Sequence, residues 1–242
     1  MEKKAIVHEQ GSEGGQNPIH IEEKEEIKEK GPKTFALRGG LDLIKLGRTQ
    51  FEEGYQGLEI VGDLRLNRRL AVAAEVGSEK RTQQTEQINF TTAGSYIKLG
   101  IDYNFFNNWK GMDNALFVGF RLARSIHTHT VNNYTLYALN QYLPVNTSQG
   151  FLTGEREQLS TGWLEFLFGS KVELLPNFYA GISLRMHALL NNKQPQDFGN
   201  LFAPGFNRIT DDNKFGGSIN YTLTYSFPFR FKRKVPKNQE AF

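Results

Sequence analysis

Side chains of alternating character occupy eight short segments between residues 34 and 229, and this pattern constrains the fold more than any other feature. In the last segment, one set of alternate positions is Tyr221, Leu223, Tyr225 and Phe227, and the other is Asn220, Thr222, Thr224 and Ser226. A period of two is that of a β-strand, whose successive side chains leave opposite faces. The sequence therefore predicts eight strands in one sheet with an apolar face and a polar face.

The other seven segments, within residues 37–43, 58–66, 70–77, 97–105, 116–123, 163–174 and 178–190, divide in the same way. Their polar face carries the charged residues Arg38, Asp42, Glu59, Asp63, Arg65, Glu75, Lys98, Asp102, Arg121, Glu165, Lys171, Glu173 and Arg185. Most strand glycines share this face, including Gly40, Gly100 and Gly181, whereas Gly39, Gly62 and Gly217 lie on the apolar face.

Glycines that accompany charges indicate which face is concave. Inside a narrow closed sheet, small residues must alternate with the long side chains that fill the tube. A soluble barrel has its charges outside, where glycine has no packing reason to accompany them. We therefore predict an all-β fold, an eight-stranded antiparallel transmembrane up-and-down β-barrel with long extracellular loops. A soluble sandwich with a buried aromatic core is the alternative.

The overall composition agrees with this fold class. Mean hydropathy is −0.50, and no apolar stretch approaches the roughly 20 residues of a spanning helix. The net charge of +3 and the lack of a basic stripe with stacking aromatics argue against a nucleic-acid partner. The chain has no cysteine, which excludes disulfides and thiolate metal sites. Because the first 30 residues lack a signal peptide, we expect that it has been removed.

We expect three regions along the chain. Residues 1–33 read as a flexible, charged periplasmic tail, with a short amphipathic helix as the alternative, residues 34–229 form the barrel, and residues 230–242 form a basic carboxy-terminal tail. Short connections at 67–68 and 175–177 alternate with long ones at 78–92, 127–161 and 191–213. Short turns are typical of the periplasmic rim and long loops of the cell exterior. We therefore expect the amino and carboxy termini of the chain to lie on the periplasmic side.

Three stretches carry a resemblance to a known family: LEIVGDLRLNRRLAVAAEVG from Leu58, NFTTAGSYIKLGIDYNFFNNWKGMDNALFVGFR from Asn89, and NLFAPGFNR from Asn200. They resemble an uncharacterised family of small outer-membrane β-barrel proteins of Bacteroidota. The similarity covers about residues 35–230 and leaves out the amino-terminal tail. It implies an outer-membrane location and supplies no activity.

The inward charges are nearly balanced in sign, which predicts mutual pairing across an obstructed lumen. A narrow channel is the alternative. Ser125, His127 and His129 share one face of the fifth strand, and His187 lies at a similar height on the seventh, which leaves a rim-sited lipid or peptide hydrolase as another alternative. No nucleophile motif accompanies them, and two histidines are half a metal site. We predict no catalytic, cofactor-binding or metal-binding residues.

Large apolar side chains in two long loops suggest contact with other proteins, or folding back over the barrel mouth. These contact candidates are Tyr137, Leu139, Phe198, Leu201, Phe202, Phe206 and Arg208. The sequence therefore favours a non-enzymatic accessory or scaffolding subunit of a larger cell-envelope complex. Its expected partners are outer-membrane lipid and other outer-membrane or periplasmic proteins.

Overall fold

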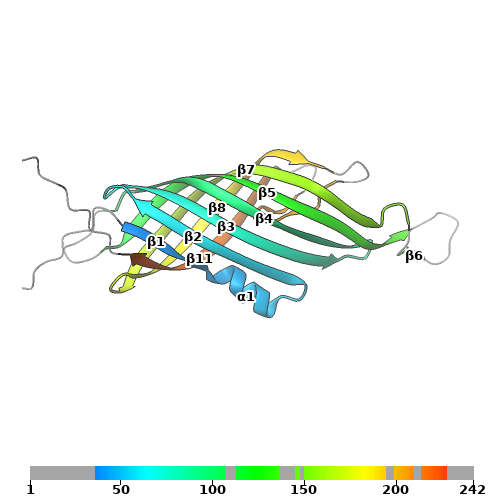
Figure 1. Cartoon of the computed structure of the whole chain (residues 1–242), viewed down its shortest axis with the longest axis horizontal. Coiled ribbons are helices and arrows are strands. Elements are labelled where there is room, and N and C mark those ends of the chain that lie inside the picture. Colours follow the sequence, from blue (N-terminus) through cyan, green and yellow to red (C-terminus); the bar gives the residue numbers. More distant parts are fainter. Residues whose placement is uncertain are drawn as a thin grey trace, which may run out of the picture.

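A ring of eight antiparallel strands dominates the structure, a computed structural model that describes residues 36–106, 113–136, 145–147, 150–194, 199–209 and 214–227. The ring strands are β1 (Ala36–Asp42), β2 (Tyr55–Arg65), β3 (Leu70–Gln84), β4 (Ile88–Asn104), β5 (Ala115–Leu136), β7 (Gly154–Leu175), β8 (Phe178–Lys193) and β11 (Phe215–Phe227). Each pairs with its neighbours in this order, and β11 pairs with β1 to close the ring (Figure 1). The two tails predicted at residues 1–33 and 230–242 lie outside the described residues.

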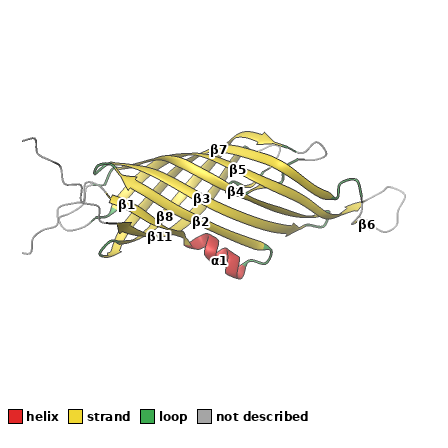
Figure 2. Ribbon diagram, in the orientation of Figure 1, coloured by secondary structure: helices red, strands yellow, loops and turns green. Residues whose placement is uncertain are grey.

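Four smaller elements accompany the ring, and among them helix α1 lies against its side and β6 at one end (Figure 2). Strand β6 (Val145–Thr147) pairs with the end of β5, and β9 (Phe202–Ala203) forms a small hairpin with β10 (Asn207–Arg208). Helix α1 (Leu43–Phe51) directly follows β1. Among the described residues, no helix has the length and apolar character needed to cross a membrane.

The two faces of the ring have the polarity that the alternation predicts. Apolar side chains point outward: Leu99 is 53% exposed, Phe166 37% and Leu184 55%. The adjacent charged residues point inward: Lys98 is 1% exposed, Glu165 0% and Arg185 6%. The ring therefore presents an apolar outer wall and encloses an ionic interior, the reverse of a soluble barrel.

The inward glycines make room for long interior side chains, as the sequence argument requires. A Cβ at Gly77 would lie 2.2 Å from the Tyr96 hydroxyl, one at Gly119 would lie 2.3 Å from Asp102 Oδ1, and one at Gly100 would lie 2.8 Å from Arg121 Cδ. By contrast, a Cβ at the outward Gly39 or Gly62 would meet no atom closer than 3.5 Å. Interior packing therefore requires the inward glycines, whereas it does not require Gly39 or Gly62.

The short turns lie at the end of the ring where β1 begins and β11 ends (Figure 1). Strands β7 and β8 turn through Pro176 and Asn177, and Asn177 has a φ of 70°. The expected long connection at 78–92 is wrong, because β3 continues to Gln84 and β4 begins at Ile88. Apart from Ala93, their outward side chains beyond Val76 and Ile97 are polar, so apolar alternation does not mark these extensions of the strands.

Helix α1 differs from the sequence prediction, which placed Leu43 in the first strand. Asp42 caps the helix: its Oδ1 accepts from the backbone N of Ile44 at 2.8 Å and of Lys45 at 3.2 Å. Strand β1 pairs only with residues 60–65 of β2 and 222–227 of β11. Helix α1 packs against both β2 and β11, so it covers the part of the wall where β1 is missing (Figure 1).

Candidate functional site: the charged interior and its mouth

Glu75 on β3 is the centre of the interior charge network. Its Oε2 lies 2.6 Å from Arg185 Nη1 on β8, and its Oε1 lies 3.1 Å from Arg121 Nε on β5. Lys98 Nζ on β4 is 3.6 Å from Glu75 Oε2. One buried carboxylate thus faces three cations from three strands, a geometry that stabilises charge where water is scarce.

Two further carboxylates balance these cations on the loop side of Glu75. Lys98 Nζ lies 3.2 Å from Glu165 Oε1 and 3.4 Å from Glu59 Oε2. Arg185 Nη1 lies 3.1 Å from Glu165 Oε2, and the indole of Trp163 donates to Glu165 Oε1 at 2.8 Å. Each member of this group therefore has more than one partner.

Further ion pairs fill the end near the short turns, and one of them shares Arg121 with the Glu75 group. Asp63 accepts from Arg38 and from Lys171, both at 2.6 Å. Arg121 Nη1 lies 2.6 Å from Asp102 Oδ1, and Arg65 Nη1 lies 2.6 Å from Asp113 Oδ1. These contacts confirm the expected mutual pairing for all the predicted interior charges except Asp42 and Glu173.

Those two carboxylates have other roles in the described structure. Asp42 caps α1 and accepts a hydrogen bond from Asn220. Glu173 accepts from the backbone N of Asn177 at 2.9 Å, so it holds the turn between β7 and β8. Both point inward as expected, and both bind neutral donors.

Lys45 is an interior cation that the strand pattern missed, because it enters from α1. Its Nζ lies 2.5 Å from Glu79 Oε1 and 3.0 Å from Glu59 Oε2, and it also donates to the Tyr96 hydroxyl. Burial opposes its charge, but the attraction of Glu59 and Glu79 outweighs burial and raises the pKa of Lys45. Nothing in the alternation around residue 45 indicates this contact.

Small spaces remain between the side chains inside the ring. A cavity bordered by Glu75, Asp102, Arg121 and Arg185 has a volume of about 30 Å³. A second one near Arg38 and Arg65 has about 20 Å³, and a third beneath α1, near Lys45 and Asn220, has about 40 Å³. Spaces of this size hold one or a few water molecules.

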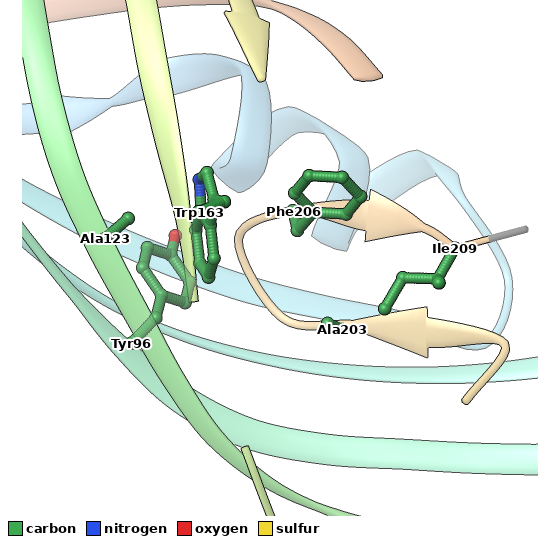
Figure 3. Packing of buried hydrophobic residues seen from close by; sticks show 6 residues of the cluster. All are labelled: Tyr96, Ala123, Trp163, Ala203, Phe206 and Ile209. Carbon is green, nitrogen blue, oxygen red and sulfur yellow. The ribbon is translucent and has the colours of Figure 1, made fainter. Parts of the chain in front are cut away.

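The β9–β10 hairpin folds into the mouth of the ring (Figure 3). Phe206 and Ile209 join a buried cluster with Tyr96, Ala123 and Trp163, and the Phe206 and Trp163 ring centroids lie 5.8 Å apart. The backbone N of Gly205 donates to Glu79 Oε2 at 3.0 Å. The hairpin is therefore bound to the charge network as well as to the apolar cluster.

This packing corrects part of the expected contact surface. Phe202 and Phe206 are each 1% exposed, so they fold back over the mouth and present no outer surface. Leu201 is half-buried and Arg208 is exposed. Tyr137, Leu139 and Phe198 lie outside the described residues.

The candidate rim histidines divide among separate sets of contacts. His127 Nδ1 is 3.3 Å from Ser125 Oγ, and its Nε2 is 3.0 Å from Asn200 Nδ2. His129 contacts Thr92 Oγ1 at 2.7 Å, and His187 contacts Ser218 Oγ at 3.0 Å. All three histidines and Ser125 are at most 2% exposed. In the part of the chain that the structure describes, no three potential metal ligands come together.

His129 lies on the loop-side extension of β5, beyond the outward apolar run that ends at Ile126, and should make the stability of the chain depend on pH. Burial, reinforced by repulsion from His127 and Arg156, lowers the pKa of His129 to about 4. A folded-state pKa below the unfolded value of about 6.5 means that its contribution to stability is present above pH 6.5 and is lost as the pH falls toward 4. Lowering the pH from 7.5 to 5 should reduce the free energy of unfolding by about 1–2 kcal/mol through this group.

Urea unfolding of the purified chain in neutral detergent at both pH values measures this effect. The matched variant His129→Gln removes the titrating group and should show a smaller loss over the same interval. An equal loss in both proteins would assign the pH dependence to other groups.

A family model described as Domain of unknown function (DUF6048) matches residues 4–232. The match begins at residue 4, so it includes most of the segment that the resemblance to outer-membrane barrels leaves out. No curated protein matches the chain, and no solved structure matches it.

Proposed function

We propose that this chain, which belongs to the family described as Domain of unknown function (DUF6048), is a non-enzymatic β-barrel of the bacterial outer membrane that serves as an accessory or scaffolding subunit of an envelope complex. The observation that carries the proposal is the outer wall. Leucine, isoleucine, valine and aromatic side chains cover it on every strand of the ring. Apolar surface on this scale is favourable only against lipid or another apolar surface. Strand pairing around the closed ring satisfies most of its backbone, as a bilayer requires, and α1 covers the gap beyond β1.

The distribution of outward residues supports a band of limited height. On β4 the outward residues change from Ile97, Leu99 and Ile101 to Ser95 and Thr91 toward the loop end. On β5 they change from Leu122 to Thr128 and Thr130. A lipid-facing band ends in this way at the headgroup level.

The interior supports a structural role over transport. Paired charges occupy the axis, and two cavities beside them, of about 30 and 20 Å³, have room for no more than a few water molecules. A narrow channel would instead show stepwise conductance in a planar bilayer.

The contact between Ser125 and His127 favours a hydrolase, but the burial of both side chains opposes it. A lipase or peptidase activity of the wild-type chain that Ser125→Ala abolishes would support the hydrolase.

The exposed aromatics at the loop end are the best candidates for contacts with a protein partner. Phe51 at the end of α1 is 88% exposed and Phe151 is 79% exposed, the two highest values among the large apolar side chains described. Arg208 in the β9–β10 hairpin is also exposed. Exposed aromatic and arginine side chains are enriched at protein interfaces.

Co-purification from mild detergent tests this role. The wild-type chain should retain a specific partner, and Phe51→Ser should reduce its recovery severalfold, because an aromatic anchor is lost. Gln50→Ser is the matched control, since it alters an exposed neighbour on the same helix and should retain the partner. Recovery of the wild-type chain as an isolated monomer would contradict the proposal.

A further inference from the structure

The outer wall carries one arginine within its apolar band. Arg124 on β5 is exposed and shares its face with Leu122, which is 60% exposed, and Ile126, which is 63% exposed. Its partner on β4 is the outward Ile97, and its partner on β7 is Gly162. A guanidinium at this level would be costly against hydrocarbon unless an anion accompanies it.

A groove passes over this arginine and supplies space for a ligand. Its volume is about 560 Å³, and residues of β5, β7 and β8 line it. Leu122 and Leu190 form its apolar part, while Arg124, Ser160 and Lys193 form its polar part. The groove therefore has the apolar and cationic character that an amphipathic anion requires.

The local backbone accounts for the hollow. Gly162 lies between Arg124 and β8, and the side chain of Asn191 occupies the space that a side chain at position 162 would need. The pairing of β7 with β8 also shifts register between Gly162 and Trp163. This irregularity places Leu190 outside the regular pairing, where it is 56% exposed. Bulges commonly re-aim side chains beside functional sites.

The two charges of the groove, Arg124 and Lys193, differ from the cations of the interior. In the described residues, no carboxylate pairs with Arg124 or Lys193, in contrast to the cations of the interior. We propose that this groove binds an acyl-chained lipid through its phosphate headgroup, with Arg124 and Lys193 contacting the phosphate and Leu122 and Leu190 contacting a chain. The inference rests on the proposed membrane location and adds a specific lipid site to it.

Native mass spectrometry of the detergent-purified chain tests the site with two lipids of equal acyl chains. Dioleoyl phosphatidic acid should remain bound to the wild type, and dioleoylglycerol, which lacks the phosphate, should not. Arg124→Gln should lower the bound fraction of phosphatidic acid roughly tenfold, the scale of one charge-assisted hydrogen bond. Arg124→Lys should retain more than Arg124→Gln, and added inorganic phosphate should not compete, because it lacks the chains.

Lys80→Gln is the control, because Lys80 is an exposed cation on β3 outside the groove. Equal lipid retention in Arg124→Gln and Lys80→Gln, or equal binding of the two lipids, would overturn the site. A bimane label at Leu99→Cys in vesicles that contain brominated lipid reports insertion independently. Quenching of that label without lipid retention would refute the groove alone, whereas no quenching would refute the membrane location.

Discussion

Glu75→Gln should lower the free energy of unfolding by about 3–5 kcal/mol, the range typical of a buried charge that loses its partner. The Glu75 carboxylate is 3% exposed and lies within 3.6 Å of cationic atoms of Lys98, Arg121 and Arg185. Glutamine has nearly the same shape but no charge. The three cations would then share fewer carboxylates in a buried region that has room for only a few water molecules.

Urea unfolding in lipid vesicles, monitored by tryptophan fluorescence, measures this change. Glu52→Gln is the matched control, because Glu52 also forms two ion pairs, at 2.6 and 3.3 Å, but its side chain is 36% exposed. Its loss should be about 0–1 kcal/mol, as for other surface pairs. Similar losses for the two variants would contradict the view that the interior network stabilises the ring.

Leu99→Arg should destabilise the chain in a bilayer by about 2–4 kcal/mol, because it places a charge near the middle of the apolar band. Leu99 lies on β4 between the outward Ile97 and Ile101. Ser95→Arg puts the same charge on the same face of the same strand, two residues from Ile97 at the loop-side edge of the apolar band, and should cost about 0–1 kcal/mol.

The free energies of unfolding of these two variants in vesicles distinguish an outer wall that faces lipid from one that faces water. A surface that faces water tolerates either substitution within about 0.5 kcal/mol. Equal and small effects of Leu99→Arg and Ser95→Arg would therefore contradict a lipid-facing wall.

Much of the ring could be predicted from the sequence, because alternation reports directly on a strand that separates two environments. The segment from Ile97 to Phe105 shows this clearly, since each apolar residue points outward and Lys98 and Asp102 point inward. The inward glycines were informative for the same reason. Their positions depend on local space, which a neighbouring long side chain such as Tyr96 or Arg121 occupies.

The elements that the sequence did not predict lie where strands no longer alternate between apolar outward and polar inward side chains. Beyond Val76 on β3 and Ile126 on β5, both faces carry polar residues, so alternation gives no signal there although the strands continue. Helix α1 depends on the cap at Asp42 and on tertiary contacts of Lys45. The inward fold of Phe206 depends on Trp163, a residue distant in the sequence.

A cysteine scan along β4 tests directly whether the apolar outer wall faces lipid. The chain contains no cysteine, so no prior substitution is needed. Single cysteines at Ser95, Ile97, Leu99 and Ile101 would each carry a bimane label, in vesicles that contain brominated lipid. If the wall faces lipid, labels at positions 97, 99 and 101 should be strongly quenched by the brominated lipid, and these cysteines should react little with a water-soluble maleimide. At position 95 quenching should be weak and the reaction with maleimide should be ready. Ready labelling by maleimide and no lipid quenching at Leu99→Cys would show that the apolar wall does not face a bilayer.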